Sequence, residues 1–210
     1  MGDVSVEFIK NYSSLSWKEA QLIMERDFTC GYCGNHTSSV RGLPLTKKQI
    51  TKNATGNYTS YSQKNQSGVY ICTHCQLPSF FWDDVQVPGH RFGSHVEGIS
   101  SELSNLYEEA RNSYSVGAYT GVVLLCRKLL MNIAVELGET SGKNFVQYVN
   151  YLNDNHFISA NSRSWVDKIR TSGNEANHET IIKTKDDAAN LIKFCEMLMK
   201  TNFEYPSLLD

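Results

Sequence analysis

Two Cys-x-x-Cys pairs have the residue type and spacing to bind a metal: Cys30 with Cys33, and Cys72 with Cys75. They lie in the segments FTCGYCGN and YICTHCQL, each of which reads as the tip of a tight turn. Thiolates three positions apart can point at one ion, and four thiolates close the tetrahedral shell of a structural zinc site, with Zn–S distances of about 2.3 Å. The sequence therefore predicts one structural zinc ion held by these four cysteines.

The separation between the two pairs is unusually long. Residues 34–71, a stretch of 38 residues, exceed the roughly 15–20 of a compact zinc module, so the chain must leave the metal and return to it. Disulfides and a redox Cys-x-x-Cys are the alternatives. Disulfides are disfavoured because MGDVSVEFIK lacks the apolar segment of a signal peptide. A redox motif is normally single and begins a helix, whereas this one is duplicated.

The stretch between the cysteine pairs is also basic. It contains no Asp or Glu, and its cationic residues are Arg41, Lys47, Lys48, Lys52 and Lys64. Cations beside stacking aromatic rings are typical of surfaces that bind nucleic-acid backbones or single strands. We therefore predict nucleic-acid contacts by these five residues and by Tyr58 and Tyr61. The alternative is a solvated insertion whose tyrosines pack over the metal site.

The overall composition is that of an ordinary globular protein. The chain has 210 residues, of which 40% are hydrophobic and 20% charged, and its net charge is −2. No apolar run approaches the roughly 18 residues that a membrane-spanning helix needs. We therefore expect a cytoplasmic protein with reduced thiols and no membrane partner. The remaining cysteines, Cys126 and Cys195, lie in apolar helical segments and are predicted to be buried.

The pattern of hydrophobic and turn residues changes near residue 99. Before it, we expect a short helix over 16–26 and strands over 58–61 and 68–72, with a polar turn between these strands. After it, helical periodicity covers residues 100–114, 118–138, 144–155, 162–171 and 185–203. The 118–138 segment is apolar almost all round and is expected to be the central helix.

These elements predict an α+β fold that is mainly α. We expect a small zinc-ribbon-like module with its leading short helix over residues 1–82, and a connector rich in Gly and Pro over residues 83–98. An antiparallel helical bundle is expected over residues 99–210.

Three short patterns carry a resemblance to a known family. They are Leu106-Tyr107-x-x-Ala110, Tyr119-x-x-x-Val123 leading to Arg127, and Ile169-Arg170-x-x-Gly173-Asn174-x-x-x-His178. Over roughly residues 97–203 the chain resembles the prokaryotic domain-of-unknown-function family 4145, in which a cysteine zinc module can precede the helices. The resemblance implies helices like those of the HEPN superfamily (higher eukaryotes and prokaryotes nucleotide-binding). Many HEPN proteins are metal-independent ribonucleases of toxin or phage-defence systems, and they often work as dimers.

The HEPN motif implies Arg170, Asn174 and His178 as catalytic residues. Arg170 would neutralise charge at the phosphate, Asn174 would position it and His178 would exchange a proton. The spacing departs from the motif, because seven residues separate Arg170 from His178 instead of four to six. In the alternative interpretation Gly173 ends one helix, Asn174 caps the next segment, and the arginine and histidine are structural.

We therefore expect a zinc-containing protein that binds nucleic acid or a protein partner in a bacterial or phage defence or mobile-element system, dimerising through its helical domain. A metal-independent endoribonuclease using Arg170 and His178 is the first alternative. A structural adaptor that touches no nucleic acid is the second.

Overall fold

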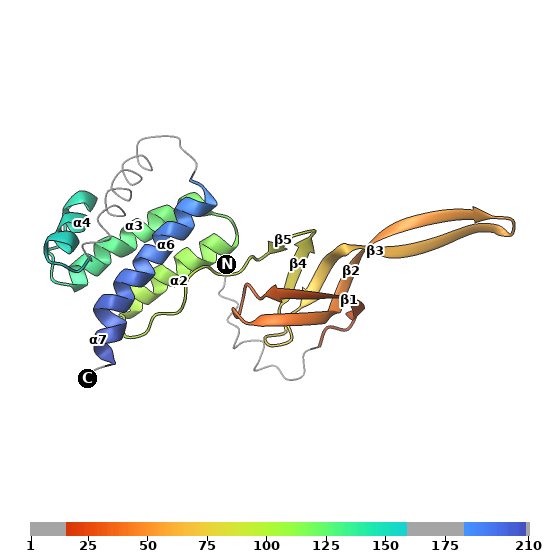
Figure 1. Ribbon diagram of the computed structural model, residues 1–210, viewed down its shortest axis with the longest axis horizontal. Coiled ribbons are helices and arrows are strands. Elements are labelled where there is room, and N and C mark those ends of the chain that lie inside the picture. Colours follow the sequence, from red (N-terminus) through yellow and green to blue (C-terminus); the bar gives the residue numbers. More distant parts are fainter. Residues whose placement is uncertain (1–15, 159–182, 209–210) are drawn as a thin grey trace. The chain divides into compact units, whose positions relative to one another are not determined.

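The structure is a computed structural model that describes residues 16–158 and 183–208. The chain divides into two compact units, Met1–Arg91 and Phe92–Asp210. In the described ranges the first unit is built from strands and the second from helices (Figure 1). None of the helices in these ranges has the length and apolar character needed to cross a membrane.

The N-terminal unit is a five-stranded antiparallel sheet whose strands lie side by side in chain order. The strands are β1 (Gln21–Thr29), β2 (His36–Asn53), β3 (Gly56–Ile71), β4 (Pro78–Trp82) and β5 (Val85–Val87). Antiparallel neighbours need only short connections, and the two turns that flank the β2–β3 hairpin hold the cysteine pairs.

The β2–β3 hairpin is much longer than the strands beside it. Strand β1 pairs with β2 only from His36 to Gly42, and β4 pairs with β3 only from Gly68 to Ile71. The distal part of the hairpin therefore continues alone as a two-stranded ribbon, seen projecting from the sheet in Figure 1. We call residues 46–63 the β-arm.

An irregularity in pairing marks the base of the β-arm. Pro44 pairs with Gly68 and Thr46 with Gln63, so Leu45 faces the four residues 64–67 of β3. Asn65, inside this stretch, has a positive φ of 42°. The polar stretch 62–67, predicted as a turn between two short strands, therefore lies within one long strand, and its residues 64–67 form a bulge.

Three aromatic rings form the centre of the sheet's core. Phe28, Tyr70 and Phe81 are buried and meet edge to face, with centroids 5.0 Å apart for Phe28–Phe81 and 5.5 Å for Tyr70–Phe81. The Arg26 guanidinium lies 4.2 Å from the centroid of the Phe81 ring and donates to the Asp83 carbonyl oxygen at 2.7 Å. Quadrupole and cation attraction thus add to the burial of these rings.

The predicted helix over residues 16–26 is wrong, because residues from Gln21 onward form strand β1. Leu22 and Met24, read as an apolar helix face, are 83% and 52% exposed. The partners that fix the strand are remote in sequence: Leu22 pairs with Arg41, and the Tyr70 hydroxyl donates to the Met24 carbonyl oxygen at 2.9 Å. Tertiary pairing overrides local helix propensity here.

The predicted fold class needs the same correction. Strands occupy most of residues 21–87, so a mainly α fold with only a small zinc-ribbon-like module is wrong. An α+β fold is present, but its strand half is an extended antiparallel sheet with a long protruding hairpin. The sequence pattern did not indicate these long strands, because the exposed hairpin is rich in polar residues and lacks the apolar alternation of a half-buried strand.

The helical unit agrees more closely with the sequence. It contains α2 (Ser101–Ser115), α3 (Tyr119–Glu136), α4 (Phe145–Asp154) and α6 (Lys185–Met199), followed by a π-helical turn (Lys200–Glu204) and α7 (Tyr205–Ser207). Helix α3 contacts α2, α4 and α6, which confirms it as the central helix. The predicted segment 162–171 lies outside the described residues.

Helix starts in this unit are fixed by side-chain caps. The Ser100 hydroxyl accepts from the Leu103 N–H at 3.2 Å. Asn144 and Thr184 begin α4 and α6 with capping boxes, in which the side chain at the cap and the one three residues later each satisfy a backbone N–H. These local signals explain why helix starts could be read from the sequence.

Candidate metal centre and basic arm

The first cysteine pair lies in the turn between β1 and β2. The Cys30 N–H donates to the Asn35 carbonyl oxygen at 2.9 Å, and the Gly34 N–H donates to the Cys30 carbonyl oxygen at 2.9 Å. The Tyr32 N–H points at the Cys30 Sγ at 3.4 Å. The tight turn holds both sulfurs on one side, with Gly34 supplying a φ of 72° that other residues adopt at a cost.

The second pair, in the turn between β3 and β4, repeats this geometry. The Cys72 N–H donates to the Leu77 carbonyl oxygen and the Gln76 N–H to the Cys72 carbonyl oxygen, both at 3.0 Å. Gln76 takes the place of Gly34, with a φ of 63°. Two copies of one turn therefore present two thiols each.

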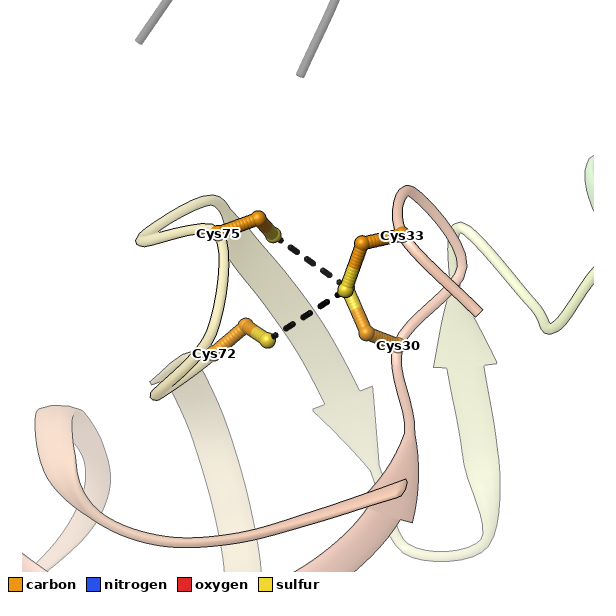
Figure 2. A group of neighbouring side chains, drawn as sticks. All are labelled: Cys30, Cys33, Cys72 and Cys75. Atoms are coloured by element: carbon orange, nitrogen blue, oxygen red, sulfur yellow. Dashed lines mark hydrogen bonds between the residues drawn. The ribbon is translucent and has the colours of Figure 1, made fainter. Parts of the chain in front are cut away.

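The four thiols converge on one point (Figure 2). All four Sγ atoms lie within 4.8 Å of one another, with Cys30 Sγ 3.6 Å from Cys75 Sγ and Cys33 Sγ 3.8 Å from Cys72 Sγ. A tetrahedron with Zn–S bonds of about 2.3 Å has sulfur–sulfur edges of about 3.8 Å. A disulfide bond is about 2.05 Å long. The cluster thus has the dimensions of a four-thiolate metal site.

Hydrogen bonding and burial shift the pKa values of the Cys30, Cys33 and Cys75 thiols. The hydrogen bond between Cys75 and Cys30 lowers the pKa of Cys30 and raises the pKa of Cys75. Burial raises the pKa of Cys33. Four thiolates so close together repel one another, and a bound cation allows all of them to ionise.

The site is closed rather than open to a substrate. Cys30 and Cys72 have no exposed surface, Cys75 is 1% exposed, and Cys33 is half-buried. Four protein ligands leave no free coordination position, which is the arrangement of a structural metal and not of a catalytic one. The His74 Nε2 lies 3.2 Å from the His36 carbonyl oxygen, and no histidine of the described residues belongs to the cluster.

A polar bridge between the two turns was missed by the sequence reasoning. The Thr37 and Thr73 hydroxyls lie 2.6 Å apart, and the buried Ser39 hydroxyl donates to the Ile71 carbonyl oxygen at 2.7 Å. These contacts join β2 to β3 and to the second cysteine turn, beside the metal site. Threonine and serine are common in this polar segment, so their sequence positions did not indicate these hydrogen bonds.

The β-arm gathers most of the residues predicted to contact nucleic acid. Its described side chains from Thr46 to Ser62 are exposed, including Tyr58 at 68% and Tyr61 at 66%. The arm carries Lys47, Lys48 and Lys52 and no acidic residue. These three lysines have no ion-pair partner among the described residues, so their charge is available to an anion.

Two predicted contact residues lie outside the β-arm. The Arg41 guanidinium donates to the Trp17 carbonyl oxygen at 3.3 Å. The Lys64 ammonium lies 3.7 Å from the Asp83 carboxylate and 3.8 Å from the centroid of the Trp82 ring. Both cations already contact other residues of the sheet unit. They differ in this from Lys47, Lys48 and Lys52 of the arm.

The candidate ribonuclease residues Arg170, Asn174 and His178 lie outside the described residues and stay a prediction.

Arg127, on α3, is 9% exposed, and its guanidinium stacks 4.4 Å from the centroid of the Phe145 ring. Burial lowers its pKa, and one of its terminal nitrogens has no hydrogen-bond partner among the described residues. Glu108, a potential partner of Arg127 on α2, instead pairs with Arg111 at 2.6 Å.

Residues 108–209 match the family described as Domain of unknown function (DUF4145), which confirms the resemblance drawn from the sequence patterns. The match falls within the helical unit, so the sheet, the cysteine cluster and the β-arm lie outside it. Neither a curated protein nor a solved structure matches the chain.

Proposed function

We propose that the N-terminal unit, which precedes the residues 108–209 that match the DUF4145 family, is a zinc-stabilised module that binds nucleic acid through the β-arm. The observation that carries the proposal is the exposed β-arm with three lysines and no carboxylate. In a defence or mobile-element system, the context implied by the HEPN resemblance, such a module would bring the helical unit to a nucleic acid.

Zinc is the metal that the donor set favours. Thiolates are soft ligands, and a closed tetrahedral set of four selects zinc or iron–sulfur chemistry over Mg²⁺ or Ca²⁺. The two turns fix four sulfurs around a single point, which suits one ion. We assign the ion a structural role: it ties both ends of the β2–β3 hairpin together and so supports the arm.

Charge separation along the hairpin supports a polyanionic ligand. Two carboxylates of the sheet contact residues outside the arm: Glu25 accepts from the Ser38 hydroxyl at 2.7 Å, and Asp83 pairs with Lys64. Lysines brought to phosphates release condensed counterions, and this release drives backbone binding.

Fluorescence anisotropy with labelled DNA and RNA oligonucleotides at about 50 mM salt, where phosphate contacts are strongest, tests the proposal. We expect wild-type binding that weakens steeply with salt, and loss of most affinity in the variant Lys48→Glu/Lys52→Glu. The matched control is Lys128→Glu/Lys193→Glu, which changes the net charge equally at two exposed helical positions. This control should bind like the wild type.

Two results would overturn the proposal. One is equal binding by the arm variant and the wild type. The other is absence of binding to any of the oligonucleotides at low salt by a protein that contains its metal, which would favour the structural adaptor.

A further inference from the structure

Register assigns the arm's side chains to two faces. Directly opposed residues of an antiparallel pair share a face, and neighbours along a strand alternate. Lys48 is opposed to Tyr61, and Lys52 lies on the same face because it is four residues from Lys48. Lys47 and Tyr58 fall on the opposite face, since Lys47 adjoins Lys48 and Tyr58 is opposed to Thr51. Each face therefore carries at least one lysine and one tyrosine.

This two-sided arrangement does not suit a flat surface on which the bases of a single-stranded nucleic acid stack. Proteins that stack successive bases of a single strand place several aromatic rings on one surface. Tyr58 and Tyr61 are three residues apart on one strand, so they point to opposite sides of the ribbon. An element with cations and aromatics on both sides is suited to a ligand that contacts both sides at once.

The dimensions of the β-arm match such a ligand. Eight residue pairs, from Thr46–Gln63 to Asn53–Gly56, extend about 27 Å at about 3.4 Å per residue. The major groove of B-form DNA is about 12 Å wide and admits a two-stranded ribbon. The major groove of A-form RNA is deep and narrow, and side chains cannot read it.

The base of the arm is anchored in a way that fixes its direction. The Gln63 side-chain amide donates to the Ser67 carbonyl oxygen at 3.1 Å and lies 3.0 Å from the Tyr70 hydroxyl. Its Oε1 accepts from the Met24 N–H at 3.0 Å. One side chain thus ties the last residue of the arm on β3 to β1 and to the aromatic core. An arm held in this way loses little conformational freedom when it binds.

We propose that the β-arm inserts into the major groove of duplex DNA, with its two faces against the two walls of the groove. Lys48 and Lys52 reach the phosphates of one strand and Lys47 those of the other. Tyr58 and Tyr61 pack against the groove on opposite sides of the ribbon. This inference rests on the proposed nucleic-acid binding and specifies the form of nucleic acid.

Binding to a 20-base-pair DNA duplex, its separated strands and the RNA duplex of the same sequence tests the ligand class. The DNA duplex should bind tightest. Lys47→Ala and Lys48→Ala, one on each face, should each weaken duplex binding about fivefold to tenfold near 100 mM salt. Each should also reduce the salt slope by about 0.9, as expected for the loss of one phosphate contact. Lys128→Ala is the matched control and should leave both quantities unchanged.

Chemical protection of the bound duplex tests the groove directly. Guanine N7 lies in the major groove and adenine N3 in the minor groove, so methylation by dimethyl sulfate reports both. We expect protection of N7 in wild-type complexes and its loss with Lys48→Glu/Lys52→Glu.

Protection confined to N3, tighter binding of single strands or of RNA duplex, or an effect of only one face would overturn the insertion while leaving nucleic-acid binding in place. Absence of all binding would instead refute the proposed function on which the insertion rests.

Discussion

The two units of the chain differ in how much apolar core they possess. The helical unit buries 24 residues of the described chain in one cluster, from Val96 to Met199. The sheet unit buries seven in its cluster, and three of these are the cysteines Cys30, Cys72 and Cys75. Small cores rarely stabilise a fold without a metal or disulfide. A metal at the cysteine cluster would supply in the sheet unit the stabilisation that hydrophobic packing supplies in the helical unit.

The cysteines follow the same division. Cys126 and Cys195 are fully buried in the helical core, and the Cys195 thiol donates to the Cys126 carbonyl oxygen at 3.8 Å. The hydrogen bond with Cys126 and burial raise the pKa of Cys195. These two thiols act as small apolar side chains, while the other four converge on one point at the end of the sheet.

The largest effect is expected from removing one metal ligand. Cys72→Ser should abolish metal binding and unfold the strands β1–β5, because metal binding in such sites contributes about 10–16 kcal/mol and a whole domain is stable by only about 5–15 kcal/mol. Elemental analysis and two-dimensional NMR would measure both changes. Cys195→Ala is the control and should retain the metal and the strand signals. A Cys72→Ser protein with native strand signals would show that the sheet unit does not depend on a metal.

Thiol labelling should separate the two groups of cysteines. In the metal-bound protein none of the six thiols should react rapidly with a maleimide. After chelation the four cluster thiols should react, while Cys126 and Cys195 stay protected until the helices unfold, since thiol reactivity requires an accessible thiolate. Mass spectrometry would count the labels. Labelling of all six at one rate would show that the two units unfold together.

Neighbouring phenylalanines on β4 provide a matched test of the small core. Phe81 is 2% exposed and Phe80 is 40% exposed. Phe81→Ala should destabilise the sheet unit by about 3–5 kcal/mol, as for other large-to-small core substitutions, whereas Phe80→Ala should change stability by less than about 1 kcal/mol. Denaturant unfolding followed by strand-specific NMR signals measures both. Equal effects would mean that Phe81 is not the centre of this core.

The smallest expected effects compare the two cysteine turns. An added Cβ at Gly34 meets no atom within 4 Å, so Gly34→Ala should cost only the strain of its positive φ, about 1 kcal/mol. Gln76→Gly should relieve similar strain, offset by loss of the bond from Gln76 Nε2 to the Thr73 carbonyl oxygen at 3.2 Å. Thermal unfolding of the sheet unit should therefore shift down for the first variant and slightly up for the second. Shifts in the same direction would contradict the equivalence of the turns.

The parts of the molecule that the sequence predicted are those fixed by local chemistry. The spacing of Cys30 and Cys33, repeated at Cys72 and Cys75, required only two turns to bring sulfurs together. Ser100 marks a helix start because its own hydroxyl caps the backbone three residues on. Such signals act within a few residues and can be read without knowledge of the fold.

The parts that were mispredicted depend on partners far away in the chain. Leu22 and Met24 belong to a segment with helix-forming residues, yet they lie in a strand because Arg41 of β2 pairs with Leu22 and the Tyr70 hydroxyl donates to the Met24 carbonyl oxygen. The β-arm could not be foreseen as one ribbon, because its bulge at residues 64–67 reads as a turn. Lys64 resembles the other lysines in sequence, and only the fold places it beside Asp83.

Amide hydrogen exchange before and after metal chelation measures whether the sheet unit depends on the metal while the helical unit does not. We predict that chelation removes protection from β1–β5 and leaves α2, α3, α4 and α6 protected, and that added zinc restores the strands. Retained protection in the strands after the metal has gone, or equal loss of protection in both units, would contradict this prediction.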